Sequence, residues 1–340
     1  PKYTEVLHPT NDSSPPRLSG FVGRRTTRGS WSALGLALLL VGMPLLVLVT
    51  EGTSGPSELE EGAQRSEVIT ITWDEVWNLS DSPVTVDEPI HIGSPSTTDP
   101  ASLTIERGVV VNIIGTSTGI SVWGGSSINI EGTSDQPVTV NVGLEDPGIR
   151  VEGVNWTDEG IAEMTASYAI FNQTEWNGAS PAIQTLDNSR VVIESSVFMN
   201  HVNNSAIRVD SSHGFGLGLV EVHNSLFQDN LYAIGHPDSA SSSPVIITNS
   251  TFVNNTWATN GMVGQRAEIS GSLFEGVNKI YPFGGVYQGN CFRGDFTIHD
   301  FDGQFPSDLV SLVGNTFIDS QISMDQQYAG NISGNNFLQM

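Results

Sequence analysis

A short phrase ending in phenylalanine returns along the second half of the chain, and it constrains the fold more than any other feature. Each copy has an apolar residue, two small or polar residues, Ser or Asn, any residue, and then Phe. The copies end at Phe198, Phe227, Phe252, Phe274, Phe292, Phe317 and Phe337. Phe171 ends a degenerate further copy, and successive copies are 18 to 29 residues apart. A period of this length indicates a solenoid in which each repeat forms one coil.

The residues between the phenylalanines indicate which kind of solenoid this is. A leucine-rich repeat needs several Leu per coil and a helical return segment. Here Val, Ile and Phe alternate with polar residues, and Gly, Asn and Ser separate the short apolar runs. Such alternation is typical of short strands broken by turns. Three short strands and three turns use about the observed repeat length, so each repeat is predicted to be one coil of a β-helix.

The repeated phrase predicts three columns of stacked side chains. The phenylalanines form an aromatic stack in this prediction, and burying each ring is worth about 2–3 kcal/mol. The apolar residues that open each copy are expected to face inward: Ile193, Val222, Ile247, Ile269, Tyr287, Leu312 and Ile332. The third column bonds to neighbouring coils, at about 1 kcal/mol net per hydrogen bond. It contains Ser196, Ser225, Ser250, Ser272, Asn290, Asn315 and Asn335. A structural role explains all three columns.

The segment before these repeats carries a second signature, reading SLTIERGVVV and then VWGGSSINIEGTSDQPVTV. It resembles the right-handed parallel β-helix superfamily, the pectate-lyase-like proteins. The matching positions are Leu103, Thr104, Ile105, Gly108, Val122, Gly124, Gly132, Thr133, Pro137 and Val138. The resemblance covers about residues 85–340 and implies an all-β fold, a right-handed single-stranded parallel β-helix solenoid. It implies no single activity, because the superfamily includes lyases, polygalacturonases and adhesins.

The catalytic motifs of that superfamily are absent from this sequence. Polygalacturonase-like members carry N-T-D, D-D, G-H-G and R-I-K, and none of these strings occurs here. Pectate-lyase-like members bind Ca²⁺ through several carboxylates and use Arg or Lys as a base, but only eight Lys and Arg residues follow Glu51. We therefore expect a non-enzymatic scaffold for surface display, adhesion or glycan binding. The alternative is a Ca²⁺-dependent polysaccharide lyase or glycoside hydrolase acting on extracellular glycans.

The densest group of chemically useful side chains lies in RGDFTIHDFDG, residues 293–303. If this stretch is a strand, Asp300 and Asp302 share one face. There they could hold Ca²⁺, with Asp295 as a further ligand, or act as an acid–base pair beside Arg293. The competing interpretation is an acidic turn facing solvent, and it is the one we expect.

Three tryptophans occur in polar, turn-like surroundings: Trp156, Trp176 and Trp257. An exposed indole can stack on a sugar ring, so these residues are candidates for carbohydrate binding. Packing against a loop is the competing interpretation, and we favour it.

Seven sequons follow the apolar segment, at Asn78, Asn155, Asn172, Asn203, Asn249, Asn254 and Asn331. Turns rich in Asn, Ser and Thr generate such triplets by chance. We expect N-glycosylation at a few of them if the host has the machinery.

The N-terminal part has a different composition. Residues 31–50 form an uncharged apolar segment long enough to cross a bilayer as a helix. Residues 1–30 contain Arg24, Arg25 and other bases, and acidic residues follow from Glu51. The positive-inside rule therefore predicts a single-pass signal anchor in the plasma membrane, with a cytoplasmic tail of residues 1–30. A cleaved secretion signal is the alternative. Residues 51–66 predict a flexible acidic stalk, and residues 67–340 the external β-helix.

The net charge of −24, from 13 basic and 37 acidic residues, argues against nucleic acid as a partner. The expected partners are the membrane, through the anchor, and an extracellular polysaccharide or surface protein. We expect no cofactor, except Ca²⁺ in the enzymatic alternative. The last repeat stops three residues after Phe337. We therefore expect a β-helix truncated at its C-terminus, the membrane-proximal piece of a longer protein.

Overall fold

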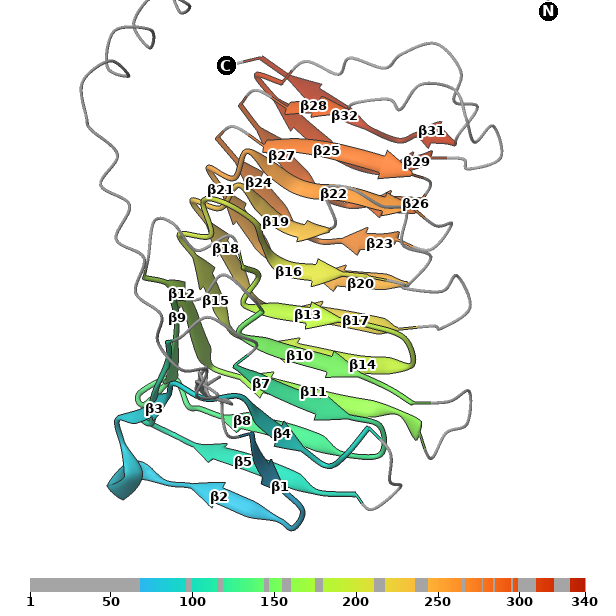
Figure 1. Ribbon diagram of the computed structural model, residues 1–340. Coiled ribbons are helices and arrows are strands. Elements are labelled where there is room, and N and C mark those ends of the chain that lie inside the picture. The colour runs from blue at the N-terminus through green and yellow to red at the C-terminus, as the bar shows by residue number, and fades with distance from the viewer. Residues whose placement is uncertain are drawn as a thin grey trace, which may run out of the picture. The chain divides into compact units, whose positions relative to one another are not determined.

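A computed structural model describes residues 68–339, without 96–99, 115–118, 144–146, 155–159, 175–179, 211–217, 236–243, 264–266, 277, 284, 295, 299–309 and 321–330. The described residues belong to one compact unit, Ala63–Met340. Short strands wind through it coil upon coil, from β1 in blue to β32 in red (Figure 1).

The strands form three sheets, called A, B and C below. Sheet A contains β1 (Ile69–Ile71), β4 (Ile90–Ile92), β7 (Ile120–Trp123), β10 (Ile149–Glu152), β13 (Ile183–Thr185), β16 (Ser205–Val209), β19 (Tyr232–Gly235), β22 (Trp257–Val263), β25 (Asn278–Phe283) and β28 (Phe296–Ile298). Sheet B contains β2 (Glu75–Trp77), β5 (Ser102–Glu106), β8 (Ser127–Glu131), β11 (Ala162–Ser167), β14 (Ser189–Glu194), β17 (Leu219–His223), β20 (Val245–Thr248), β23 (Ala267–Ser270), β26 (Gly285–Gln288), β29 (Val310–Val313) and β31 (Ile332–Ser333). Sheet C contains β3 (Val84–Val86), β6 (Val110–Ile114), β9 (Val138–Gly143), β12 (Ala169–Gln173), β15 (Val197–Met199), β18 (Leu226–Gln228), β21 (Thr251–Val253), β24 (Leu273–Glu275), β27 (Cys291–Arg293), β30 (Thr316–Ile318) and β32 (Asn336–Leu338).

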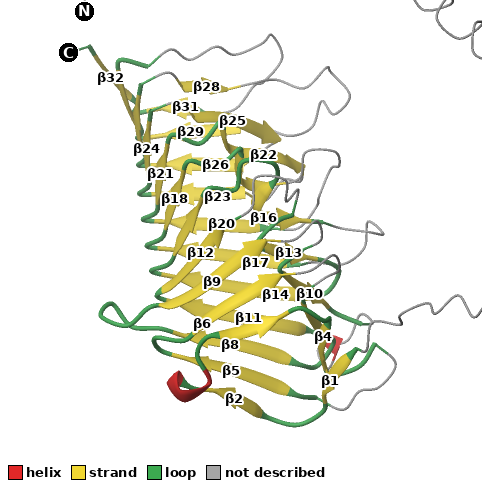
Figure 2. Cartoon of the chain, turned by 60° about the vertical axis from the view of Figure 1, so that its left-hand side comes forward, coloured by secondary structure: helices red, strands yellow, loops and turns green. Residues whose placement is uncertain are grey.

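From β1 to β30, each coil contributes one strand to sheet A, then one to B and one to C, and β31 and β32 continue sheets B and C. Every paired strand in these sheets lies parallel to its neighbours in the preceding and following coils, as between β14 and β17 or β15 and β18. The predicted all-β parallel β-helix solenoid is therefore confirmed (Figure 2). Its right-handed sense stays a prediction, and it agrees with the hand that parallel crossovers take in nearly all proteins.

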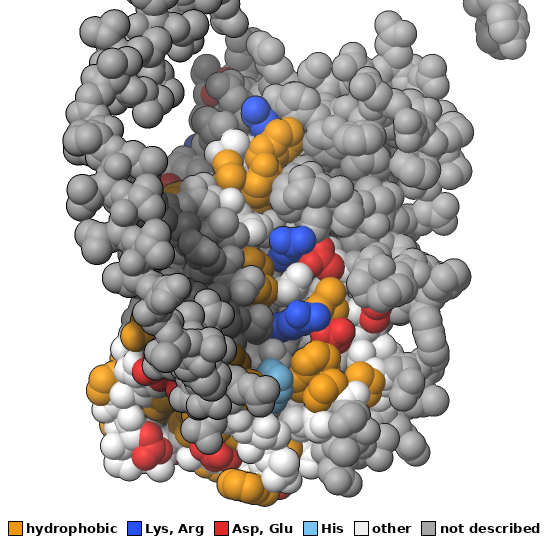
Figure 3. All heavy atoms as spheres, viewed as in Figure 1, with side chains coloured by type: hydrophobic (Ala, Val, Ile, Leu, Met, Phe, Trp, Pro, Cys, Tyr) orange, Lys and Arg blue, Asp and Glu red, His pale blue; other side chains and the backbone are white. Residues whose placement is uncertain are grey.

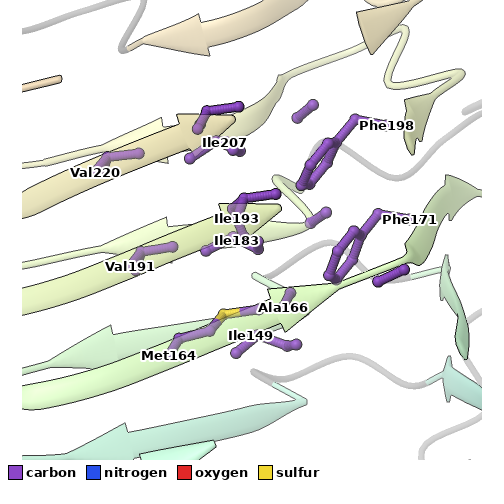
Figure 4. Packing of buried hydrophobic residues seen from close by; sticks show 14 of the residues in the cluster. Ile149, Met164, Ala166, Phe171, Ile183, Val191, Ile193, Phe198, Ile207 and Val220 are labelled. Atoms are coloured by element: carbon purple, nitrogen blue, oxygen red, sulfur yellow. The ribbon is translucent and has the colours of Figure 1, made fainter. Parts of the chain in front are cut away.

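The phenylalanines form the predicted stack inside sheet C. Phe171 to Phe317 are at most 1% exposed. Neighbouring rings lie 4.6 to 5.1 Å apart between centroids, with interplanar angles of 5° to 20°. Figure 4 shows Phe171 and Phe198 one above the other, with Ile149, Ile183 and Ile207 stacked across the core. The stack ends at Phe337, which is 62% exposed.

The Ser and Asn column forms the predicted ladder at the turn from sheet B to sheet C. The backbone N–H of Ser272 donates to Oδ1 of Asn290, and that of Asn290 donates to Oδ1 of Asn315, both at 2.9 Å. The residue just before the ladder takes a left-handed backbone, as at Asn249 (φ 50°) and Gly314 (φ 63°). Asn and Gly tolerate this conformation, which explains the small or polar residue that precedes the ladder in the repeated phrase.

A second ladder lies at the turn from sheet C to sheet A, three residues after Phe. The backbone N–H of His201 donates to Oδ1 of Asn230 at 3.0 Å, and that of Asn230 donates to Oδ1 of Asn255 at 3.2 Å. The Nδ2 of Asn255 also donates to the carbonyl oxygen of Phe227 at 3.0 Å. These buried side chains therefore satisfy backbone groups that the turn would otherwise leave without partners.

The first coil contains a short 3₁₀ helix, η1 (Leu79–Asp81), which Asn78 caps. Among the described residues, none of the helices is long and apolar enough to cross a membrane. The predicted tail, anchor and stalk, residues 1–66, lie outside the described residues.

Candidate functional site

The turns around each coil differ strongly in length. From β14 onward, two residues separate each strand of sheet B from the next strand of sheet C. Nine residues separate β10 from β11, β16 from β17, and β12 from β13. Both borders of sheet A thus receive the longer connections. Loops of variable length on a rigid scaffold are where binding sites usually develop, so the outer face of sheet A is the candidate binding face.

One polar cluster on this face surrounds Trp123 at the end of β7. The guanidinium carbon of Arg150, on β10, lies 5.8 Å from the centroid of the Trp123 ring, a cation–π contact. The His91 ring, on β4, meets the same indole edge-on at 5.8 Å and 77°. Arg150 also forms an ion pair of 2.6 Å with Glu152 on its own strand. An indole, an imidazole, a cation and a carboxylate therefore lie together on three neighbouring strands.

A second polar cluster lies on the same face, two coils further along. The Nε of Arg208, on β16, donates to Oδ2 of Asp210 at 2.8 Å. The Nε2 of Gln184, on β13, donates to the same oxygen at 2.6 Å. The Asp210 side chain is 11% exposed and that of Arg208 is 28% exposed. The chain therefore builds the same Arg–carboxylate pair twice on sheet A.

A third group of side chains, two aromatic and one basic, lies at the start of the sheet A strands nearer the C-terminal end. Trp257 on β22 pairs in register with Tyr232 on β19 and with Lys279 on β25. The Lys279 ammonium lies 5.1 Å from the centroid of the Trp257 ring. Figure 3 shows Lys and Arg side chains beside Asp and Glu side chains along this side of the molecule, with hydrophobic side chains between them.

The electrostatics of the face are close to neutral. Arg150 and Arg208 each pair with a carboxylate two residues further along the chain, Glu152 within β10 and Asp210 just after β16. Burial, and secondly the charge of Arg150, lower the pKa of His91, so its imidazole is uncharged at neutral pH. The face therefore offers many hydrogen-bond donors and acceptors with little net charge.

Of the three tryptophans predicted to bind carbohydrate, the structure describes only Trp257. Trp257 begins β22 of sheet A and is partly exposed, with the Lys279 ammonium over its ring. Trp156 and Trp176 lie outside the described residues, in the segments between β10 and β11 and between β12 and β13.

The predicted metal and catalytic group is described only at Arg293. Its side chain is half exposed on sheet C, where it pairs with Glu275 at 3.4 Å. Asp295, Asp300 and Asp302 lie outside the described residues. Within the described part of the chain, no group of three or more His, Cys, Asp or Glu side chains is placed to hold a metal ion.

The sequons fall at several kinds of position. Asn78 uses its Oδ1 to cap η1, accepting from the N–H of Ser80 at 2.9 Å. Asn172 accepts a bond of 2.9 Å from Nδ2 of Asn200 on the outer side of sheet C. Four others are exposed: Asn203, Asn249, Asn254 and Asn331. Asn155 lies outside the described residues.

The residues of the two Arg–carboxylate clusters were not predicted from the sequence. A signal for them exists, because IRVE at 149–152 and IRVD at 207–210 are nearly the same tetrapeptide. In both, the first and third residues are buried and the Arg at the second position is partly exposed. The fourth residue pairs with that Arg, from a partly exposed position at Glu152 and a buried one at Asp210. This shorter repeat belongs to sheet A, as the phenylalanine phrase belongs to sheets B and C.

The strand pairing and this face together define a parallel β-helix with a polar, aromatic outer face on sheet A. No family model matches the chain, and no curated protein matches it. Among solved structures, it is similar to the crystal structure of the TibC-catalyzed hyper-glycosylated TibA55-350 fragment. That match has 12% sequence identity, covers 80% of this chain and 100% of the fragment, and has a TM-score of 0.20. So low a score supports no conclusion about function.

Proposed function

We propose that the protein is a membrane-anchored, extracytoplasmic β-helix scaffold for surface display, and that the outer face of sheet A binds extracellular glycan. The observation that carries the binding role is the joint placement of Trp123, Arg150 and Glu152 with Gln184, Arg208 and Asp210 on one face. Carbohydrate sites combine aromatic rings with polar groups that both donate and accept hydrogen bonds.

The membrane location rests on the apolar segment at residues 31–50 and on the basic residues before it. Adding protease to intact cells tests this arrangement. Digestion of the β-helix with retention of a small membrane-bound fragment supports the proposal. A β-helix released into the medium instead indicates a cleaved signal.

The binding role is tested with the compact unit from Ala63 to Met340, purified and passed over immobilised polysaccharides with and without Ca²⁺. Retention of the wild-type unit, and loss of retention in the double variant Arg150→Ala/Arg208→Ala, are expected. Retention that survives this double change places binding elsewhere and removes the main support for the proposal.

The alternative function is a Ca²⁺-dependent polysaccharide lyase or glycoside hydrolase that uses Arg293, Asp295, Asp300 and Asp302. It is favoured by the concentration of these residues within positions 293–302 of the sequence. New chain ends released in the same samples, and lost when a chelator is added, would establish this activity.

Glycosylation is part of the proposed surface role. Asn203, Asn249, Asn254 and Asn331 have exposed side chains, which supports their use as acceptors in a host that modifies sequons. A mobility shift after treatment with an N-glycan amidase, followed by peptide mapping, identifies the modified positions.

A further inference from the structure

A column of hydrogen-bonding side chains follows the axis of the coils on the outer face of sheet A. The strand registers place these residues directly above one another: His91, Ser121, Arg150, Gln184 and Arg208. Neighbouring strands of a sheet are about 4.8 Å apart, so the five positions extend over about 19 Å. Ser121 is only 4% exposed, whereas His91, Arg150, Gln184 and Arg208 are partly exposed. Four of the five coils therefore present a hydrogen-bonding side chain, in an array that a periodic ligand parallel to the axis can contact.

The charges within this array are already neutralised. Glu152 pairs with Arg150 at 2.6 Å, and Asp210 accepts from both Arg208 and Gln184. His91 is uncharged at neutral pH because burial lowers its pKa. An acidic polymer would therefore meet the carboxylate of each pair together with its cation, and would approach a chain of net charge −24.

Paired groups of this kind suit the hydroxyls of a sugar. Each hydroxyl can donate to a carboxylate oxygen and accept from a guanidinium or amide N–H. The apolar faces of sugar rings can contact aromatic side chains, which this face provides at Trp123, two residues along β7 from the column.

We propose that sheet A binds a linear polysaccharide of uncharged sugars, lying parallel to the coil axis across β4 to β16. This inference rests on the proposed glycan-binding function and specifies its ligand class and direction. The length of the column predicts that several sugar units are held at once. The paired charges predict that binding is insensitive to salt, because no net charge on the ligand is neutralised.

Isothermal titration calorimetry of the Ala63–Met340 unit tests both parts. The probes are cello-, xylo- and manno-oligosaccharides of increasing length, together with oligogalacturonate and oligomannuronate. At least one neutral series should bind, with affinity rising until the oligosaccharide spans about 19 Å and unchanged between low and high salt. Full affinity already at one or two sugars would overturn the axial direction.

The glycan-binding function and the neutral ligand class can be contradicted separately. Preference for the acidic probes, with affinity that falls as salt rises, would overturn the neutral ligand class and leave glycan binding intact. Binding of no probe would overturn the proposed function together with the inference.

Gln184→Leu locates the array, because the change keeps side-chain volume and removes the amide that lies between the two arginines. We expect about a tenfold loss of affinity for the neutral ligand, the effect of one or two lost hydrogen bonds. Arg190→Gln is the matched control. It removes one member of an ion pair with Glu221 on the outer side of sheet B and should leave affinity unchanged.

A thermal melt of each variant verifies that both are folded. Wild-type affinity in a folded Gln184→Leu, or an equal loss in Arg190→Gln, would overturn the assignment to sheet A. Glu152→Gln supplies a second measurement if Gln184→Leu does not fold. It adds one net positive charge on sheet A, so it should alter neutral binding by less than acidic binding, and the reverse result would contradict the neutral class.

Discussion

The turn between sheets B and C and the outer face of sheet A are made by the same coils, yet they differ in almost every physical respect. At the turn, two residues connect the strands from β14 onward, and the ladder side chains are almost all buried. On sheet A, several connections that border the strands have nine residues. Its polar side chains at His91, Arg150, Gln184 and Arg208 are partly exposed. At the turn, Ser or Asn recurs in successive coils, whereas the outward residues of sheet A differ in type from coil to coil.

The difference follows from what each region must satisfy. A buried backbone group at the turn needs a partner in every coil, since leaving one without a partner costs about 1–3 kcal/mol. The polar groups of an outward side chain on sheet A can form hydrogen bonds with water. The fold therefore does not fix the residue type at such a position, and the residue can be one that binds a ligand. We therefore expect changes at the turn and in the core to lower stability, and changes on sheet A to lower binding.

The largest expected effect is in the phenylalanine stack. Phe252 is fully buried between Phe227 and Phe274, at centroid distances of 5.0 and 4.8 Å. Phe252→Ala should lower the free energy of unfolding by about 3–5 kcal/mol, through lost burial and a residual cavity. Chemical denaturation of the Ala63–Met340 unit measures this. An unchanged midpoint would contradict the inward position of the ring.

Phe337→Ala is the matched control, because this ring ends the same stack but is 62% exposed. Its removal should lower the free energy of unfolding by less than about 1 kcal/mol, since little apolar area leaves water on folding. Equal losses in the two variants would indicate that Phe337 is covered in solution.

A second large effect is expected from pH at the turn between sheets C and A. Burial lowers the pKa of His201 to about 4, a shift that a bond to the Phe171 backbone partly offsets. The unfolded chain binds this proton near pH 6.5, so the contribution of His201 to stability is complete above that pH. It is lost as the pH falls toward 4, by about 3 kcal/mol in total.

His201→Asn separates this effect from the titration of the many carboxylates. Asn occupies the same ladder position in the next two coils, at Asn230 and Asn255, so the variant should fold. The difference in unfolding free energy between wild type and variant should change between pH 7 and pH 4. A constant difference over that range would show that His201 does not stay neutral in the folded state.

Much of this fold could be predicted from the sequence because its strongest repeat is structural. A buried Phe with a buried Ser or Asn two residues before it recurs in the six successive coils from Phe198 to Phe317, so the stack and the ladder at Ser250 or Asn290 were identified correctly. The ladder at Asn230 and Asn255 was missed, since His201 occupies the same position and breaks the pattern.

The candidate site was harder to predict for the same reason. Its residues come from different coils and are different in type, so they form no column that repeats. Arg150 and Glu152 look like ordinary surface charges until register places them beside Trp123. The similar tetrapeptides at 149–152 and 207–210 were the available signal. They occur only twice, so they are much less conspicuous than the phenylalanine phrase, which returns in every later coil.

A moderate effect is expected in the ladder between sheets B and C. Asn290 accepts from the N–H of Ser272 and donates through Nδ2 to the carbonyl of Ile269, both at 2.9 Å. Asn290→Ala leaves these buried groups without a partner and should lower the free energy of unfolding by about 2 kcal/mol. Asn290→Ser should restore part of it, because Ser272 fills the same position one coil earlier. Equal denaturation midpoints for Asn290→Ala and wild type would contradict the ladder's structural role.

The smallest expected effect on stability is at Arg150, where the comparison becomes sharpest. Its side chain is 35% exposed, so solvent screens the pair with Glu152 and Arg150→Ala should lower stability by less than about 1 kcal/mol. The same change should raise the pKa of His91, because the Arg150 charge is one of the two causes that lower it. An NMR titration of the His91 ring measures this, with Arg190→Ala as the control that should leave its pKa unchanged.

If Arg150→Ala lowers stability as much as Asn290→Ala does, the polar residues of sheet A stabilise the fold as the ladder does, and no ligand is needed to explain them. If stability is kept while the His91 pKa rises and glycan affinity falls, the array at Trp123 acts through its electrostatics and contacts at the surface, as a binding face requires.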